Sequence, residues 1–414
     1  MNELGWVEHA LVAARPQAVA ALLRYFRDLD LAEEAFQDAC LRALESWPAN
    51  GPPRDPAAWL ILVGRNRGID GVRRQSRQEP LPAEEMLSDL GDAEAALAER
   101  LDGEGYRDDI LRLLFICCHP DLPPTQQIAL ALRVVCGLPV GRIARAFLVG
   151  EAAMEQRITR AKRRIGEAAL AFDTPGASER AERLAAVAAM IYLLFNEGYS
   201  AGAAEADARG PLCDEAIRLA RLLLRLFPAE PEIMGLAALM LLQHSRRDAR
   251  FDGDGAIVLL EAQDRGRWNR TAIAEGLALL DKALRHRRRG PYQIQAAVAA
   301  LHARAARPED TDWPQIAQLY GALETVQPSP VVTLNRAVAV AKVEGPAAAL
   351  AMIEPLAEAL AGYFHFFGLR GWLLQQLGRA AEARVAFCRA IALAGSAAEA
   401  DHIRRHLDRL ERAE

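Results

Sequence analysis

Residues 140–165 read VGRIARAFLVGEAAMEQRITRAKRRI, and the apolar residues of this stretch recur at the spacing of two helices. The first set is Val140, Ile143, Ala144 and Phe147, and the second set is Met154, Ile158, Ala161 and Ile165. Intervals of three and four residues place each set on one helix face. The turn between them is Leu148-Val-Gly150. The pattern predicts a helix-turn-helix whose second helix spans Glu151 to Ile165.

The outward face of that second helix carries a dense set of polar and cationic side chains. It comprises Glu155, Gln156, Arg157, Arg160, Lys162, Arg163 and Arg164. Guanidinium groups neutralise phosphates and pair with guanine, glutamine pairs with adenine, and glutamate accepts from the amino group of cytosine. The face therefore favours DNA binding. The alternative is a basic amphipathic helix that packs on an acidic partner, such as the acidic segment of residues 78–109.

A helix predicted over Leu31–Trp47 has two dissimilar faces. Its buried face consists of Ala32, Ala35, Phe36, Ala39, Cys40, Ala43, Leu44 and Trp47. The other face carries Glu34, Gln37, Asp38 and Leu41. A leucine among polar residues is typical of a surface that docks on a protein partner. The alternative is a solvated face with one exposed leucine, which is common in globular proteins.

The following helix is predicted to start at Asp55, as the N-cap, and Pro56, as its first residue. Its outer side carries a cationic ridge, formed by Arg65, Asn66, Arg67, Arg73, Arg74 and Arg77. Such a ridge can follow a nucleic-acid backbone, because each guanidinium neutralises a phosphate. A solvated charged face is the alternative.

Charge is distributed in blocks along the 414 residues. The net charge is −5 and the isoelectric point is near 6.0, which excludes a uniformly basic surface. Residues 65–77 hold five arginines against one aspartate, and residues 142–164 hold seven bases against two acids. Between them, residues 78–109 hold eleven acids against two bases. These blocks predict a first domain over 1–78, an acidic linker over 79–109 and a second domain over 110–172.

Helical patterns continue from about residue 180 to residue 414. Small residues recur there at an interval of 34, because Ala337 and Ala349 are followed by Gly371 and Ala383. Thirty-four residues is the tetratricopeptide period, in which small residues mark the close crossing of paired helices. The sequence thus predicts a tetratricopeptide-like extension over 180–414, and an all-α protein throughout.

Signals for catalysis, cofactors and membranes are missing from the sequence. It carries no nucleotide-binding glycine loop, metal-ligand spacing or nucleophile motif, so we expect neither an enzyme nor a cofactor. Cys117-Cys118-His119 is the one cluster whose residue types could ligate a metal ion. Neighbouring residues on a helix point in different directions, however, so these side chains do not converge on one ion. No metal site is therefore predicted. Without a signal peptide or an apolar span, we expect a cytoplasmic protein with no membrane contact.

Two sets of motifs, in this order, resemble the sigma factors of the extracytoplasmic-function group. Residues 32–47, Asp55-Pro-Ala-Ala-Trp-Leu60, Arg65-Asn-Arg-Gly-Ile-Asp70 and Arg73-Arg74 resemble region 2 of these proteins. Leu122-Pro-Pro-Thr125 and the helix ending Arg160-Ala-Lys-Arg-Arg-Ile165 resemble region 4. The remaining part, including Phe195-Asn-Glu-Gly-Tyr199, resembles the tetratricopeptide-like extension of one subgroup.

The resemblance implies a role for each surface. The helix with Gln37, Asp38 and Leu41 would dock on the clamp of core RNA polymerase. The ridge of residues 65–77 would engage and melt the minus-ten promoter element, and the helix of residues 151–165 would read the minus-thirty-five element. Two positions depart from the family pattern, because Leu148 stands where the turn usually has glycine and Glu155 stands at a commonly basic position.

We therefore expect a non-enzymatic sigma factor whose partners are core RNA polymerase and promoter DNA. The extension is expected to contact the first 170 residues or polymerase and so to regulate activity. One alternative is a helix-turn-helix regulator with a helical-repeat sensor, which would bind duplex DNA without polymerase. The other is a repeat scaffold that binds peptides.

Overall fold

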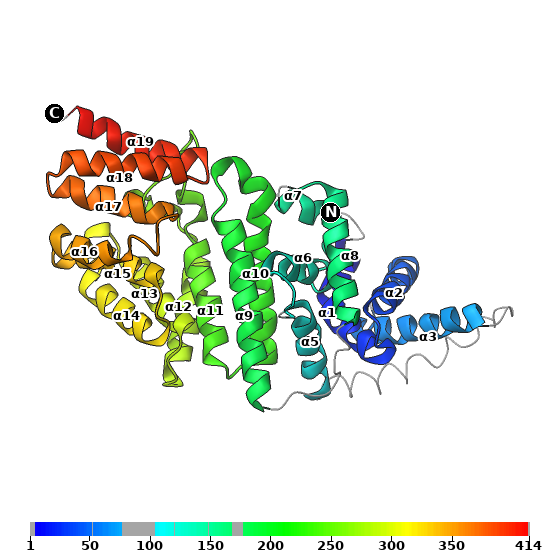
Figure 1. Cartoon of the computed structure of the whole chain (residues 1–414). Coiled ribbons are helices and arrows are strands. Elements are labelled where there is room, and N and C mark those ends of the chain that lie inside the picture. The colour runs from blue at the N-terminus through cyan, green and yellow to red at the C-terminus, as the bar shows by residue number, and fades with distance from the viewer. Residues whose placement is uncertain are drawn as a thin grey trace. The chain divides into compact units, whose positions relative to one another are not determined.

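The computed structural model describes residues 5–51, 53–76, 104–119, 121–147, 149–167 and 177–412. They divide into two compact units, Met1–Leu194 and Phe195–Glu414 (Figure 1). Within the described residues the regular elements are all helices, and the one β-type pairing is an isolated bridge between Phe251 and Ile257. The prediction of an all-α protein is confirmed. Arg77, Leu148 and most of the expected acidic linker lie outside the described residues.

Three helices form the first part of the N-terminal unit and pack pairwise on one another. They are α1 (Gly5–Phe26), α2 (Leu29–Asn50) and α3 (Pro56–Ser76). The Asp55 carboxylate accepts hydrogen bonds from the amides of Ala57 and Ala58, at 2.9 and 3.1 Å, and so caps α3 as predicted. Trp47 is buried between Trp6 and Trp59, with ring centroids 6.3 and 5.4 Å away. These aromatic contacts join the three helices.

The predicted buried face of α2 is correct except at Cys40, which is half-buried, and at Leu44. Leu44 is 45% exposed, so its assignment to the buried face was wrong. In its place Glu33 is buried, at 4% exposure. Glu33 precedes Phe36 by three residues and therefore shares its side of the helix. A charged residue thus lies within an otherwise apolar interface.

The second part of the N-terminal unit contains the predicted helix-turn-helix. Its elements are α5 (Glu104–Cys117), α6 (Pro124–Val134), α7 (Val140–Ala146) and α8 (Glu151–Glu167). Helices α6 and α7 both pack on α8, which buries Met154, Ile158, Ala161 and Ile165 as the periodicity predicted. Helix α5 packs on α1 and on α6. The two parts of this unit are therefore in direct contact.

Helix α9 (Ala177–Tyr199) carries the boundary between the units, and the C-terminal unit continues with paired helices. Its α-helices are α10 (Ala206–Leu226), α11 (Pro231–His244), α12 (Arg270–Arg285), α13 (Pro291–Arg304), α14 (Trp313–Val326), α15 (Pro330–Val343), α16 (Pro346–Ile353), α17 (Phe364–Gln376), α18 (Ala380–Leu393) and α19 (Ala397–Glu411). Short 3₁₀ turns are η2 (Ala203–Glu205), η3 (Arg247–Ala249), η4 (Leu260–Ala262), η5 (Arg265–Arg267), η6 (Pro308–Asp310) and η7 (Glu354–Leu356). Most of these long helices pack on their neighbours in the chain, whereas α13 packs mainly on α11.

The 34-residue interval corresponds to two successive helix pairs. Ala337 and Ala349 lie on α15 and α16, and Gly371 and Ala383 lie at the same places on α17 and α18. All four are buried in one apolar cluster or at its helix crossings. A Cβ atom on Gly371 would lie 2.5 Å from the ring of Phe387, closer than packed carbon atoms approach. Gly371 therefore permits the close crossing of α17 and α18.

Candidate nucleic-acid interface

Helix α8 presents most of the predicted DNA-binding side chains to solvent. Glu155, Gln156, Arg160, Arg163 and Arg164 are exposed, and Arg157 is half-buried. The buried residues of α8 hold the opposite side against α6 and α7. The helix thus carries an exposed cationic face on a packed support, as a groove-reading helix requires.

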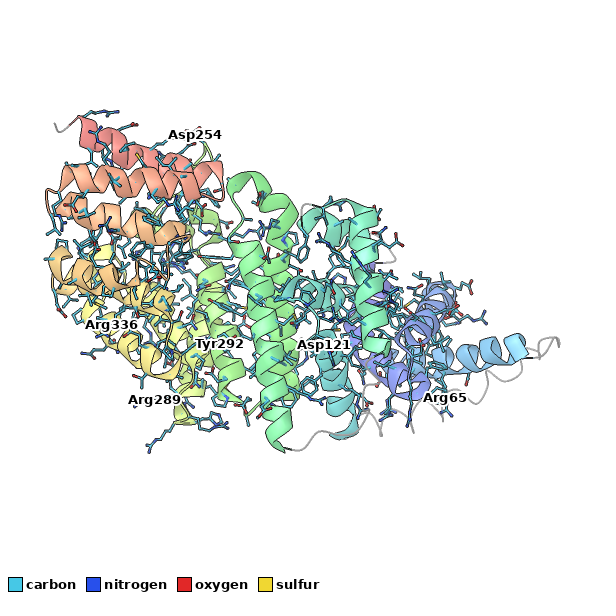
Figure 2. All side chains as sticks on the ribbon, viewed as in Figure 1. Arg65, Asp121, Asp254, Arg289, Tyr292 and Arg336 are labelled. Carbon is cyan, nitrogen blue, oxygen red and sulfur yellow. The ribbon has the colours of Figure 1, made fainter. Side chains whose placement is uncertain are left out.

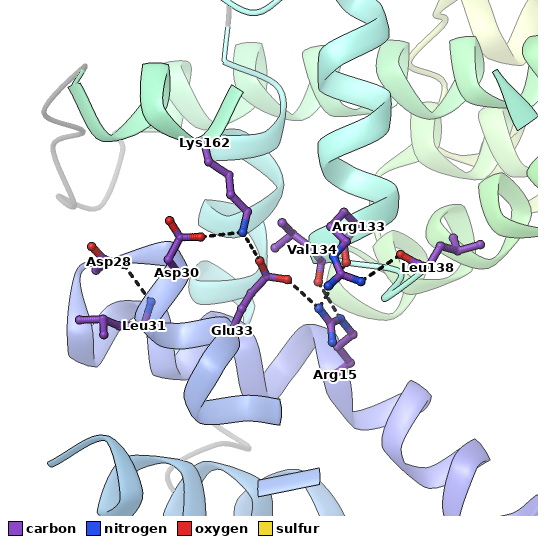
Figure 3. A network of polar contacts seen from close by, with 9 residues as sticks. All are labelled: Arg15, Asp28, Asp30, Leu31, Glu33, Arg133, Val134, Leu138 and Lys162. Atoms are coloured by element: carbon purple, nitrogen blue, oxygen red, sulfur yellow. Dashed lines mark hydrogen bonds and ion pairs between the residues drawn. The ribbon is translucent and has the colours of Figure 1, made fainter. Parts of the chain in front are cut away.

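Lys162 differs from its neighbours, because its ammonium group is already paired. The Nζ atom lies 2.7 Å from Oδ1 of Asp30 and 2.6 Å from Oε2 of Glu33 (Figure 3). Both carboxylates belong to α2. Burial lowers the pKa of Lys162, but the two carboxylates more than offset this and hold it above its ordinary value. Lys162 is therefore a charged link between α8 and α2.

Glu33 binds a second cation with its other oxygen. Nη2 of Arg15, on α1, donates to Oε1 of Glu33 at 2.9 Å, and both side chains are almost fully buried. The guanidinium of Arg15 also lies 4.9 Å from the ring centroid of Phe36. Burial lowers the pKa of Arg15, and Glu33 opposes this effect. One buried carboxylate is thus shared by cations from α1 and α8.

Arg15 also holds the end of α6. Its Nε donates to the carbonyl of Val134 at 2.9 Å, and its Nη2 donates to the carbonyl of Arg133 at 3.2 Å. These are carbonyls of the last turn, which has no further helical amides to bond. A Cβ atom on Gly137 would lie 2.7 Å from Cδ of Arg15, so glycine leaves room for the arginine. Arg15 therefore caps α6 with both hydrogen bonds and charge.

A second ion pair joins α1 to α5. Nη1 of Arg24 lies 3.0 Å from Oδ2 of Asp109, and the Asp109 side chain is 3% exposed. Arg112, one turn along α5, lies 3.5 Å from the other oxygen of Asp109. The buried carboxylate again has two cations. Arg15, Arg24, Glu33 and Asp109 were not predicted as site residues, although the position of Glu33 on the buried face of α2 is readable from the helix period.

The outer side of α2 carries the predicted docking surface. Glu34, Gln37 and Leu41 are exposed, with Leu41 at 61%, and Asp38 is half-buried. Leu44, one turn after Leu41, adds a second exposed apolar side chain. Intervals of three and four residues bring them onto one side of the helix. This surface lies on the helix that also carries Glu33, but its side chains face solvent.

The predicted cationic ridge lies partly on described residues. Arg65 and Asn66 are exposed on α3, and the guanidinium of Arg65, labelled in Figure 2, lies 4.7 Å from the ring centroid of Tyr25. Arg67, Arg73 and Arg74 lie within α3. Arg77 lies outside the described residues.

The described residues also bear on metal binding and on membrane insertion. No group of three or more His, Cys, Asp or Glu side chains is arranged there to hold a metal ion. Cys117 and Cys118 are buried, and burial raises the pKa of Cys118 to about 12, so this thiol is protonated at neutral pH. Among the same residues, no helix is long and apolar enough to cross a membrane.

Replacement of Arg15 by methionine tests the importance of the shared carboxylate. The substitution keeps the apolar stem but leaves Glu33 with one cation and the end of α6 without its cap. We expect the N-terminal unit to lose about 3 kcal/mol of stability. This value is at the lower end of the cost of breaking a buried ion pair, because Lys162 still pairs with Glu33. Hydrogen-exchange mass spectrometry of α1, α2 and α6 measures the loss. Arg142→Met removes an exposed cation and should change little; equal protection in both variants would contradict the assignment.

Comparisons with known proteins agree with the order of these surfaces. Residues 11–78 match the family described as sigma-70 region 2, and residues 112–165 match sigma-70 region 4. Residues 183–284 match a family of unknown function, DUF6596.

Two relatives extend these matches. An uncharacterized protein of Rhizobium meliloti (strain 1021) is 71% identical over 410 residues, which is 99% of this chain and 97% of that protein. A probable ECF RNA polymerase sigma factor, SigI, of Mycobacterium tuberculosis is 27% identical over 180 residues, or 44% of this chain and 61% of SigI. The chain therefore belongs to the same family as the Rhizobium protein. Because regions 2 and 4 follow one another along it, the chain belongs to the ECF-like sigma factors of the sigma-70 family that carry a C-terminal extension.

Proposed function

We propose that this protein directs transcription initiation by joining core RNA polymerase and placing it on two promoter elements. The observation that carries the proposal is the pairing, in one compact unit, of an exposed cationic helix-turn-helix with an upstream helix whose outer face is mixed apolar and polar. A DNA-reading helix alone would suit a repressor. The second surface gives the protein a means to bring a protein partner to the same DNA.

Helix α8 is the proposed reader of the minus-thirty-five element. Gln156, Arg160, Arg163 and Arg164 are exposed along it, and amides and guanidiniums at such spacings reach base edges and phosphates. Glu155 is exposed beside them and repels phosphate, so it favours positions where an amino group of cytosine is offered. The ridge on α3, beginning at Arg65 and Asn66, is the proposed minus-ten contact.

The outer side of α2 is the proposed contact with core polymerase. Leu41 and Leu44 supply apolar area, and Glu34, Gln37 and Asp38 supply a polar surround. An apolar centre within a polar rim is the usual arrangement of a protein-binding surface. In the proposed role, the protein carries out no covalent chemistry and acts in the cytoplasm with polymerase.

The C-terminal extension is proposed to regulate this activity. Within the N-terminal unit, the guanidinium of Arg183 on α9 lies 5.4 Å from the ring centroid of Phe115 on α5, which supports a contact between the start of the extension and region 4. The C-terminal unit holds a cavity of about 590 Å³. Aromatic residues in its wall are Trp313, Tyr320, Tyr363, Phe364, Trp372 and Phe387. A cavity of this size and composition suits a small ligand or a peptide side chain.

The helix-turn-helix regulator and the peptide-binding scaffold are the two alternative functions. The first predicts binding to duplex DNA without polymerase, and the second predicts no dependence of transcription on this protein. The sigma-70 region 2 match, which covers the proposed docking helix, favours initiation over both alternatives.

The docking surface is tested by the double variant Asp38→Ala with Leu41→Ala. Both positions lie away from the buried face of α2, so the fold should persist while affinity for core polymerase falls at least tenfold. A pull-down with purified core polymerase measures affinity, and circular dichroism checks the fold. Glu8→Ala removes an exposed acid from α1 as a control. Unchanged affinity in the double variant would reject this surface.

The DNA-reading helix is tested by Arg157→Ala and Arg160→Ala, each measured at several salt concentrations. Each lost phosphate contact lowers the slope of log affinity against log salt by about 0.9 on duplex DNA. Binding of the polymerase complex to an upstream-element duplex gives the slope, with Arg285→Ala, an exposed arginine of α12, as the control. Wild-type slopes in both variants would show that α8 faces protein rather than DNA.

The extension is tested by truncation after Phe172, which removes α9 and the C-terminal unit. If the extension regulates initiation, promoter-dependent transcription should change several-fold in one direction or the other. Transcription per mole of soluble protein is the measurement. A truncated chain that is as active and as soluble as the full chain would remove the regulatory role.

A further inference from the structure

The cavity of the C-terminal unit has aromatic walls and a cationic end. It is enclosed by helices α13, α14, α15, α17, α18 and α19 together with the chain between α11 and α12. Its volume of about 590 Å³ lies within the range of small-molecule sites. Trp313, Tyr320 and Trp372 line it and are only partly buried. Rings in such a wall bind another aromatic ring by offset stacking or edge-to-face contact.

Lys342 lies in the cavity wall beside two of these rings. Its Nζ atom is 5.7 Å from the ring centroid of Trp313 and 5.9 Å from that of Trp372. The same Nζ lies 2.7 Å from Oε1 of Glu261, and the two side chains of this ion pair are 30% and 52% exposed. An ion pair with this exposure contributes little to stability. A second carboxylate can therefore compete with Glu261 for the ammonium group.

Arg265 brings another cation to the same end of the cavity. Its Nη1 donates to the carbonyls of His302 and Ala305 at 2.6 and 2.8 Å. The ring of His302 packs edge to face on Trp313, with centroids 5.3 Å apart, and Trp313 in turn contacts Lys342. Within the described residues, Arg265 forms no ion pair with a carboxylate and bonds only to backbone carbonyls. Its positive charge thus adds to that of Lys342.

The histidine at this end shows the sign of the local field. Burial and the cations Arg246 and Arg265 lower the pKa of His302 to about 4, against the opposing effect of Glu261. His302 is therefore neutral at neutral pH. The described residues of the wall then hold the permanent cations Arg265 and Lys342 against one carboxylate, Glu261. This end of the cavity favours an anion.

We propose that the cavity binds a small aromatic carboxylate, whose ring lies against Trp313 and Trp372 and whose carboxylate pairs with Lys342. The inference rests on the proposed regulatory role of the extension, because the bound molecule acts through it. Two tryptophans also suit an organic cation, but Lys342 already places a cation beside both rings and Arg265 repels another. On binding, the carboxylate of the ligand replaces Glu261, which is already half exposed and passes to water.

Isothermal titration calorimetry on the full chain tests the role of the charge. The probes are benzoate, 3-phenylpropanoate and 2-naphthoate, and 3-phenylpropanamide keeps the ring of the second probe without its charge. We expect 3-phenylpropanoate to bind about tenfold more tightly than the amide, which is the contribution of one hydrogen bond between charged groups. Equal affinity for these two compounds, or no binding of any of the three carboxylates at millimolar concentration, would overturn the proposal.

Two substitutions with opposite effects locate the carboxylate. Lys342→Met keeps the apolar stem beside the tryptophans and should weaken 3-phenylpropanoate by about tenfold without changing 3-phenylpropanamide. Glu261→Gln removes the competing acid and should strengthen binding of the carboxylate. Lys282→Met, at an exposed position of α12 outside the cavity wall, is the control. Wild-type affinity in Lys342→Met, or weaker binding in Glu261→Gln, would overturn the proposal.

Two further measurements separate the source of the ligand from its effect. The peptide acetyl-Gly-Gly-Phe carries the same ring on a C-terminal carboxylate. If it binds more tightly than 3-phenylpropanoate, and its C-terminal amide does not bind, a peptide end is the occupant and the small-molecule assignment is overturned. Run-off transcription with core polymerase, with and without 3-phenylpropanoate, tests the effect. Binding without a change in transcription retains the site and rejects the regulatory role, and binding without any transcription retains the site and rejects the initiation role.

Discussion

A buried carboxylate with two cations is the constraint on which the N-terminal unit depends. Transfer of a charge out of water is unfavourable unless it is paired, so Glu33 fixes the positions of the groups around it. One of these is Arg15, which extends past Gly137 to cap α6, and the other is Lys162 at the far end of α8. Helices α1 and α5 also pack on each other, and there the buried carboxylate of Asp109 is likewise shared by two cations, Arg24 and Arg112. These buried ion pairs favour one arrangement of the helices.

Helices α2 and α8 each have a buried face that packs within the N-terminal unit and an exposed face that a partner can reach. Helix α2 buries Glu33 toward region 4 while Leu41 and Leu44 face solvent, where a protein partner can reach them. Helix α8 packs its apolar face on α6 and α7 and exposes Arg160 and Arg164. A partner that binds α2 approaches the helix that also holds Lys162.

The fold was largely predictable because helical periodicity is local, whereas the ion pairs of Glu33 with Arg15 and Lys162 were not. The apolar spacing of residues 140–165 predicted α7 and α8, Asp55 and Pro56 predicted the start of α3, and the 34-residue interval located the crossing at Gly371. Leu44 was assigned to the wrong face since the apolar stripe of α2 is wider than its contact with α1 and α3. Lys162 and Glu33 are 129 residues apart, and spacing along the chain carries no signal for such a contact. Lys162 was predicted as a DNA contact from its neighbours alone, whereas the structure pairs its ammonium group with Asp30 and Glu33.

Initiation itself is tested most directly by run-off transcription with purified core polymerase, a library of genomic fragments and the full-length protein. We expect discrete transcripts that appear only when core polymerase and this protein are both present, with start sites downstream of paired upstream and minus-ten elements. Transcripts of the same abundance without this protein would contradict it. So would a protein that binds duplex fragments tightly by itself and yields no new transcript with polymerase, because that result identifies a regulator that works without the core enzyme.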